Sequence, residues 1–239
     1  MDLMNAALKR GESWLSWRKS IISMIPKRKA DGSFTSKVED MRPISVMQEL
    51  AKATSKILAN RLGKIFLDSP YLLNRAQRAF LKNGCINQCI HTAINIFEDF
   101  RERQRLGKGE QLYVIAYDQR KAYDCVQKYT IRASLERFNL PESFIKYVES
   151  FLENAKSCFK TFYGPSEDFE VLTSVRQGDP LSPLIYILVT DALHEGLRHS
   201  PIGGRDAGGV YARSWRGIWE MHQWVRVLPG ILMWRNAST

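Results

Sequence analysis

An unbroken apolar run, Leu112-Tyr113-Val114-Ile115-Ala116-Tyr117, leads directly to Asp118 and then to the polar stretch Gln119-Arg120-Lys121-Ala122-Tyr123-Asp124. A continuous apolar run of this length, followed by polar residues, is typical of a buried strand. The pattern therefore predicts a strand that places the Asp118 carboxylate at its solvent end, which is a rigid position for a metal ligand. The alternative is structural: an aspartate of this stretch caps the helix that follows.

A second informative stretch is Val175-Arg176-Gln177-Gly178-Asp179-Pro180-Leu181-Ser182-Pro183. It predicts a turn that opens a helix, because glycine tolerates unusual backbone angles and proline fixes those of its own position. Taken alone, this stretch is explained equally well as an ordinary turn.

In this order, the two stretches resemble motifs A and B of reverse transcriptases, most closely those of non-LTR retrotransposons. Upstream, Pro26-Lys27, Arg42-Pro43-Ile44-Ser45 and Gln77-Arg78-Ala79-Phe80 resemble segments of the fingers subdomain in that family. The resemblance covers roughly residues 14 to 201. It implies an α+β fold comprising right-hand polymerase fingers and a partial palm, with mixed helices and a small antiparallel sheet.

The resemblance also implies nucleotidyl transfer assisted by two divalent metal ions, which we expect to be Mg²⁺. Such ions activate the primer hydroxyl and stabilise charge on the transferring phosphate. Mg²⁺ prefers oxygen ligands and retains water, so few protein carboxylates are needed. The family's catalytic metal ligand falls on Asp118, with the backbone carbonyl of Gln119 beside it. Asp124 is expected to be a structural hydrogen-bonding residue instead.

Five residues match the family's nucleotide-binding positions. Arg42 is expected to grip the triphosphate, for which a guanidinium is well shaped, and Lys27 to assist it. Tyr123 is expected to lie under the incoming sugar and exclude a 2′-hydroxyl. Gln177 and Gly178 are expected to touch the template base and nascent pair, where a Cβ would obstruct the approach. Tyr123 as a core aromatic and Lys27 as part of a solvated basic turn are the alternatives.

The family's motif C, an aromatic-Ala-Asp-Asp turn, is not found, and the sequence contains no Asp-Asp dipeptide at all. The resemblance is therefore to a fragment that ends before motif C. We expect this fragment to be inactive, because one carboxylate cannot hold two metal ions. The alternatives are a non-catalytic nucleic-acid-binding remnant and, less favoured, a polymerase in which an acid such as Asp206 replaces motif C.

Composition agrees with a polyanionic partner. The 239 residues include 35 Lys and Arg against 25 Asp and Glu, a net charge of +10, and counterion release would supply much of the affinity for nucleic acid. Ribosomal and chromatin proteins share this excess, so it narrows only the class of partner. By resemblance, the partners are an RNA template, a DNA primer and deoxynucleotide triphosphates, within a longer polyprotein that carries an endonuclease. The family resemblance places the chain in the nucleus or cytoplasm.

No segment approaches eighteen consecutive apolar residues, so we expect no membrane span, and the N-terminal region does not resemble a signal peptide. The four cysteines, Cys85, Cys89, Cys125 and Cys158, lack paired CxxC spacing. We interpret them as buried thiols in a reducing compartment, with a metal site that includes His91 as the alternative.

Hydrophobic spacing predicts alternating helices and strands within a first region, 1–201. Region 202–239 is rich in Trp and Arg without a sustained period, and an irregular tail is favoured there over a nucleic-acid stacking surface. One expected helix has Val46, Leu50, Ala53 and Ile57 on its buried face, and a second has Ile86, Ile90, Ala93, Ile94 and Phe97 on one face. Three further helices are expected at 129–138, from about Pro141, and at 184–197. The strands of an expected hairpin are 158–163 and 169–174, on either side of Gly164-Pro165.

Overall fold

A computed structural model describes residues 2–82, 84–107, 117–119, 121–199 and 226–227. The chain divides into two compact units, which are described separately. Unit 1 comprises residues 1–65 and 123–189, and unit 2 comprises residues 66–122 and 190–239.

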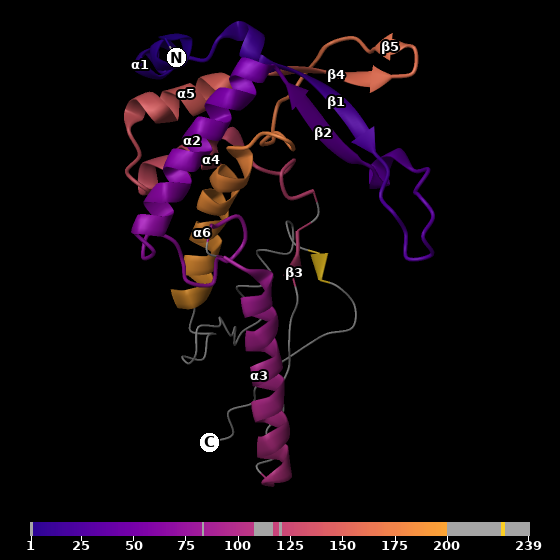
Figure 1. Cartoon of the computed structure of the whole chain (residues 1–239), viewed down its shortest axis with the longest axis vertical. Helices are drawn as coiled ribbons and strands as arrows, with labels where there is room; N and C mark the ends of the chain where they lie inside the picture. Colours follow the sequence, from indigo (N-terminus) through magenta and orange to yellow (C-terminus); the bar gives the residue numbers. More distant parts are fainter. Residues whose placement is uncertain (1, 83, 108–116, 120, 200–225, 228–239) are drawn as a thin grey trace. The chain divides into compact units, whose positions relative to one another are not determined.

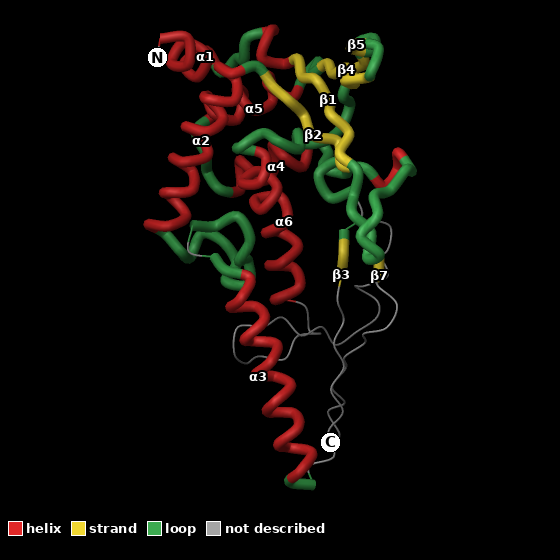
Figure 2. Tube along the Cα trace, turned by 45° about the vertical axis from the view of Figure 1, so that its right-hand side comes forward, coloured by secondary structure: helices red, strands yellow, loops and turns green. Residues whose placement is uncertain are grey.

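The described elements are a mixture of helices and short strands, which confirms the expected α+β class (Figures 1 and 2). In chain order they are α1 (Asp2–Arg10), η1 (Leu15–Arg18), β1 (Lys19–Ile25), η2 (Val38–Asp40), β2 (Arg42–Met47), α2 (Glu49–Asp68), α3 (Ile86–Arg105), β3 (Tyr117–Asp118), α4 (Lys128–Arg137), α5 (Glu142–Leu152), β4 (Lys156–Thr161), β5 (Gly164–Pro165), β6 (Phe169–Glu170), α6 (Ser182–His199) and β7 (Arg226–Val227).

Unit 1 is built on a sheet in the order β2-β1-β4-β5, with β6 also paired to β4 (Figure 1). β1 and β2 are antiparallel, with Ile25 opposite Arg42. β4 and β1 are parallel, with Lys19 opposite Lys156, whereas an antiparallel sheet was expected. This pairing joins segments more than a hundred residues apart, a non-local contact that hydrophobic periodicity does not reveal. The other pairs of this sheet are antiparallel. The chain folds back on β4 as the predicted hairpin requires, but Gly164-Pro165 is itself the strand β5, and the last strand is Phe169–Glu170 instead of 169–174.

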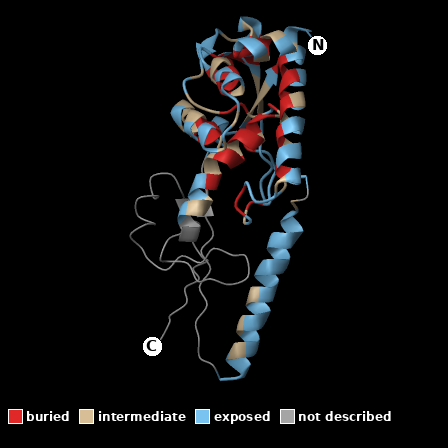
Figure 3. Cartoon of the chain, turned by 90° about the vertical axis from the view of Figure 1, so that its left-hand side faces the viewer, coloured by how far each residue is buried: buried red, intermediate tan, exposed pale blue. Residues whose placement is uncertain are grey.

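Many of the buried residues that form the core of unit 1 belong to α4, α5 and the first part of α6, and Figure 3 shows buried residues in red. Tyr147 of α5 and Leu135 of α4 are fully buried. The order of these helices follows the sequence pattern closely, and Pro141 is the N-cap residue of α5, directly before the helix. Proline is favoured near a helix start, because the first backbone N–H groups have no partner within the helix.

The predicted buried face of α2 is wrong. Val46 lies in β2 and is 57% exposed, and Leu50 is 46% exposed. The helix instead buries the row of small and apolar side chains that starts one residue later: Ala51, Thr54, Ser55, Leu58 and Leu62. Small residues allow a close approach of neighbouring backbones, so packing selected a face that hydrophobic spacing alone did not identify.

In unit 2, α3 is a helix at the predicted position, but its side chains are all exposed or intermediate, as the pale blue helix of Figure 3 shows. Cys85 and Cys89 are consequently exposed, which corrects the expectation that they are buried. Of the other two cysteines, Cys158 is buried and Cys125 is intermediate, and all four are free thiols.

The loop before α3 is tied to the second half of α6 by hydrogen bonds. The backbone N–H of Asn74 donates to Asp191 Oδ1 at 2.7 Å, and its side-chain amide donates to Glu195 Oε1 at 2.8 Å. Asp191 is buried, and its hydrogen bond with Asn74 meets the requirement of a buried carboxylate for a partner.

The predicted strand 112–117 lies outside the described residues except for its last position. There, β3 pairs antiparallel with β7, with Tyr117 opposite Val227 and Asp118 opposite Arg226. In the part of the chain that the structure describes, no helix combines the length and the apolar character needed to cross a membrane.

Candidate nucleotide-binding site

The loop at residues 176–179 lies against the edge of β2. The backbone N–H of Ser45 donates to the carbonyl of Gln177 at 2.7 Å. Gly178 has φ of 111°, and a Cβ placed on it would lie 2.7 Å from the Ser45 carbonyl oxygen. Glycine is therefore required here by contact with β2 itself, whereas the sequence suggested contact with a ligand. Gly178 is exposed and Gln177 is half-buried.

Tyr123 is held beside the same loop. Its carbonyl accepts a hydrogen bond from Val175 N at 3.2 Å, and its ring stacks on Tyr186 of α6 with centroids 5.1 Å apart. Burial raises the pKa of the Tyr123 phenol, so the hydroxyl remains protonated at neutral pH. The ring is half-buried, so Tyr123 is not a fully buried core aromatic, and its place under the incoming sugar stays a prediction.

Arg42 and Lys27 are both exposed and lie at the end of the β1–β2 pair where residues 26–41 connect the two strands. Arg42 is opposite Ile25, and Lys27 follows two residues later, with its carbonyl accepting from Thr35 N at 3.0 Å. Among the residues that the structure describes, neither Arg42 nor Lys27 forms an ion pair.

The first and last residues of the loop, Arg176 and Asp179, are buried charges, and no role was predicted for either from the sequence. Arg176 is 4% exposed, donates to the carbonyls of Trp17 and Arg18, and lies 4.5 Å from the ring centroid of Phe151. Burial lowers the pKa of the Arg176 guanidinium to about 10, so it is still charged at neutral pH. The only sequence feature that points to Arg176 is its place directly before Gln177, in a stretch that was predicted to be a turn.

Asp179 is 4% exposed on the other side of the loop. Its Oδ2 accepts from the backbone N–H of Ser182 at 3.0 Å and from the Ser182 hydroxyl at 2.9 Å. Burial raises the pKa of the Asp179 carboxyl, while its hydrogen bonds and the charge of Arg176 partly oppose the rise. Asp179 therefore satisfies a free N–H group at the start of α6.

Two of the predicted site residues, Asp118 and Gln119, belong to unit 2. The five predicted nucleotide-binding residues belong to unit 1: Arg42, Lys27, Tyr123, Gln177 and Gly178. Asp118 is the last residue of β3, at the end of the predicted strand, and Gln119 is half-buried.

The helix-cap alternative finds no support in the start of α4. That helix begins at Lys128 after the N-cap residue Gln127, with no side-chain capping bond. Asp124 lies three residues before this cap, so it does not act as the N-cap.

The fit to a two-metal centre is incomplete. Within the described ranges, no three His, Cys, Asp or Glu side chains gather closely enough to hold a metal ion. The sequence predicts one carboxylate ligand, Asp118, and Mg²⁺ is usually held by one or two carboxylates together with water and substrate phosphates.

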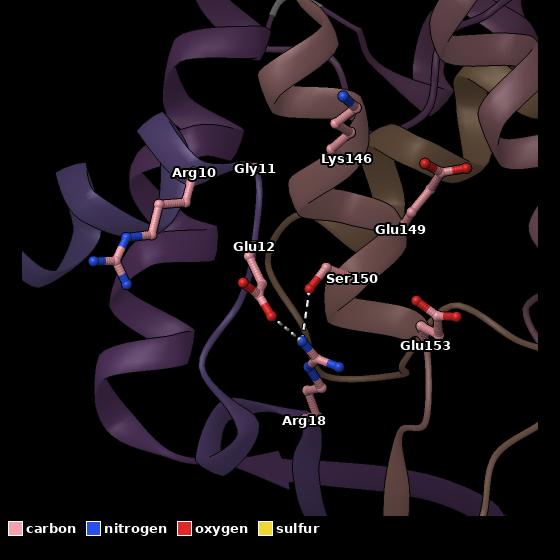
Figure 4. Close-up of a pocket in the computed structure, with 8 residues that line it drawn as sticks. All are labelled: Arg10, Gly11, Glu12, Arg18, Lys146, Glu149, Ser150 and Glu153. Atoms are coloured by element: carbon pink, nitrogen blue, oxygen red, sulfur yellow. Dashed lines mark hydrogen bonds and ion pairs between the residues drawn. The ribbon is translucent and has the colours of Figure 1, made fainter.

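A separate pocket of about 370 Å³ lies beside α1 and α5 in unit 1 (Figure 4). Arg18 reaches into it and contacts Glu12 at 3.6 Å and Ser150 Oγ at 2.8 Å. Its charged lining residues are balanced in sign, which does not suit a triphosphate: Arg10, Arg18 and Lys146 against Glu12, Glu149 and Glu153. None of the predicted site residues lines this pocket.

Residues 25–212 match the family described as "Reverse transcriptase (RNA-dependent DNA polymerase)". Because this match covers most of the sequence, the chain belongs to the reverse transcriptase family.

The similar proteins are of the predicted non-LTR retrotransposon type. The "Retrovirus-related Pol polyprotein from type-2 retrotransposable element R2DM" of Drosophila melanogaster is 30% identical over 212 residues, covering 88% of this chain and 18% of that protein. The R2 polyprotein of Nasonia vitripennis is 29% identical, covering 80% and 17%. The chain thus spans less than a fifth of the length of these relatives.

Solved structures of telomerase from Candida tropicalis also resemble the chain. The apo enzyme truncated from its C-terminal domain aligns with a TM-score of 0.49 and 16% identity, covering 76% of this chain and 39% of that one. The complex with a telomeric RNA fragment aligns with a TM-score of 0.47 and 14% identity, covering 80% and 34%.

Proposed function

We propose that this chain is the fingers and partial palm segment of a retrotransposon reverse transcriptase, and that it binds a template–primer duplex and a deoxynucleotide triphosphate. The observation that carries the proposal is the bond between Ser45 N and the Gln177 carbonyl. This bond joins the Gln177 loop to β2, the strand on which Arg42 lies, so the groups expected to hold the triphosphate and the nascent base pair share one framework.

Each nucleotide-binding residue has a separate role in this proposal. The Arg42 guanidinium binds phosphate oxygens in pairs, with Lys27 as a second cation at the same end of the sheet. Tyr123, supported by its stack on Tyr186, forms the floor under the sugar and selects deoxynucleotides. Gln177 and Gly178 contact the template base and the nascent pair.

Reverse transcriptases use divalent metal ions in nucleotidyl transfer. The ligands that we propose from this chain are the Asp118 carboxylate and the backbone carbonyl of Gln119, both oxygen donors of the kind that Mg²⁺ prefers. The metal would stabilise charge on the transferring phosphate. A template RNA and a DNA primer are the polyanionic partners that the net charge of +10 favours, in a longer polyprotein with an endonuclease.

A direct test compares Arg42→Ala with the unchanged chain in binding to two ligands, a triphosphate and an RNA–DNA duplex. We expect triphosphate affinity to fall by about tenfold or more, because a charge-assisted bidentate contact is lost, and duplex affinity to change little. Duplex affinity should also weaken steeply between low and moderate salt.

The matched control is Arg10→Ala, which removes another exposed arginine, in α1. It changes the net charge equally, so it separates a local role of Arg42 from general electrostatics. Equal losses of both ligands in the Arg42 variant would remove the role assigned to that residue.

The second candidate is a nucleic-acid-binding remnant without chemistry. It is favoured by the absence of an Asp-Asp dipeptide from the 239 residues. A chain that binds the duplex but no triphosphate would support this candidate. Neither candidate polymerises, because a single carboxylate does not hold two metal ions. Mg²⁺-dependent primer extension on an RNA template would therefore contradict both and would favour a replacement acid such as Asp206.

A further inference from the structure

A buried arginine, Arg176, directly precedes Gln177 and Gly178 and has no role in the proposed function. Arg176 donates to the carbonyl of Trp17 at 3.1 Å and to the carbonyl of Arg18. A buried guanidinium is costly unless its N–H groups are satisfied. The two carbonyls and the face of Phe151 supply part of that compensation, while the buried Nε has no hydrogen-bond partner among the described residues.

These two carbonyls belong to η1, directly before β1 begins at Lys19. β1 is in register with β2, and β2 binds the loop through Ser45. The arginine therefore closes a ring of contacts that runs from the loop to η1, along β1, across to β2 and back to Gln177. A planar guanidinium fork fixes two acceptors at once, which an ammonium cannot do with the same geometry.

The other end of the loop is fixed independently. Asp179 accepts two hydrogen bonds from Ser182, so the chain is anchored to the start of α6 immediately after Gly178. With both ends anchored, the position of the Gln177 backbone depends on the anchors, whereas the half-buried Gln177 side chain remains partly accessible.

We propose that Arg176 is a positioning residue that sets the Gln177-Gly178 loop at the correct distance from the strand carrying Arg42. This inference rests on the proposed function, in which the loop contacts the nascent base pair and Arg42 grips the triphosphate. Arg176 touches neither ligand and acts through the loop that it holds.

The test uses Arg176→Met, which keeps apolar length and removes the fork, and Arg176→Lys, which keeps the charge. The matched control is Arg132→Met, because Arg132 bonds Glu136 at 2.8 Å and Glu149 at 2.6 Å and links α4 to α5 away from the loop. Amide hydrogen exchange at Ser45 reports the bond to Gln177 without any nucleic acid. Thermal unfolding reports global stability in each variant.

We expect Arg176→Met to speed exchange at Ser45 by about tenfold more than the control does, because a local opening then no longer requires global unfolding. In a preformed complex with an RNA–DNA duplex, its affinity for the triphosphate that matches the template should fall by about tenfold, with duplex affinity unchanged. Arg176→Lys should restore less than the full protection.

Unchanged protection at Ser45, or wild-type protection in Arg176→Lys, would overturn the positioning role. So would losses of triphosphate affinity that follow thermal stability equally in Arg176→Met and Arg132→Met. Failure of the proposed function would look different, because the unsubstituted chain would then bind no triphosphate. In that case Ser45 protection would still report whether Arg176 holds the loop.

Discussion

At the scale of single residues, Gly178 shows how a site loop depends on its own framework. Its φ of 111° lies in a region that residues with a side chain rarely adopt, and an added Cβ would meet the Ser45 carbonyl oxygen at 2.7 Å. Two separate costs therefore disfavour any other residue: strain in the backbone and overlap with β2.

We predict that Gly178→Ala lowers the free energy of unfolding by about 1 to 3 kcal/mol. The control is Gly63→Ala within α2, where an added Cβ has no neighbour within 4 Å. There alanine should stabilise by up to about 1 kcal/mol, because it restricts the unfolded backbone and favours the helix. Chemical denaturation of the three proteins measures both changes. A Gly178 variant as stable as the parent would show that the loop does not press on β2.

A second prediction follows from the raised pKa of Asp179. The folded carboxyl binds its proton more tightly than the unfolded one, whose ordinary pKa is 3.8. Between the unfolded and the raised folded pKa, the folded state therefore holds more protons, and stability falls as pH rises through that window. Relative to Asp179→Asn, which cannot ionise, the parent chain should gain stability as pH falls from neutrality.

Denaturation of both proteins over a series of pH values measures this difference. Asparagine keeps an oxygen that can accept from Ser182 N, so the helix cap is retained. A difference that does not vary with pH, or that grows in favour of the asparagine variant on acidification, would contradict the raised pKa.

Residue patterns predicted part of this site. The match to motif B singled out Gln177 and Gly178, and the structure places both against β2, while their contact with a nucleotide stays a prediction. The bond of Asp179 to Ser182, three residues further on, is local, but the sequence was interpreted there only as a turn. The role of Arg176 was not predicted, because its partner, the Trp17 carbonyl, is specified by the tertiary fold. Sequence spacing gives no information about backbone acceptors so far away in the chain.

At the scale of elements, periodicity located helices better than it located their buried faces. The predicted helix at 129–138 corresponds to α4 at Lys128–Arg137, and the one at 184–197 to α6 at Ser182–His199. On α2 the chosen face was wrong, because Ala51, Thr54 and Ser55 are buried although their side chains are small or polar. Close packing of a helix favours small side chains, but a hydrophobic pattern gives small or polar residues little weight.

The α4–α5 pair gives the prediction at this scale. Leu135 is fully buried, so Leu135→Ala should cost about 2 to 5 kcal/mol through lost burial and the cavity left behind. Leu172→Ala removes the same atoms from a residue that is 70% exposed, and it should change stability by less than about 0.5 kcal/mol. Equal effects of the two substitutions, measured by denaturation, would contradict the assigned core.

At the scale of the whole molecule, the chain combines a basic composition with a framework that carries five nucleotide-binding candidates in unit 1. Its catalytic candidate, Asp118, belongs to unit 2. The sequence predicted the family and the order of the elements, because both depend on local motifs. It did not predict the parallel pairing of β1 with β4, which joins distant segments.

The measurement that tests the central claim most directly is triphosphate binding by the chain in complex with an RNA template annealed to a DNA primer, in the presence of Mg²⁺. The affinity for the deoxynucleotide that pairs with the template base is compared with that for the three others. The proposed function predicts tighter binding of the matched nucleotide, and loss of that binding in Arg42→Ala. Equal affinity for all four, or no binding at all while the duplex is still bound, would contradict it.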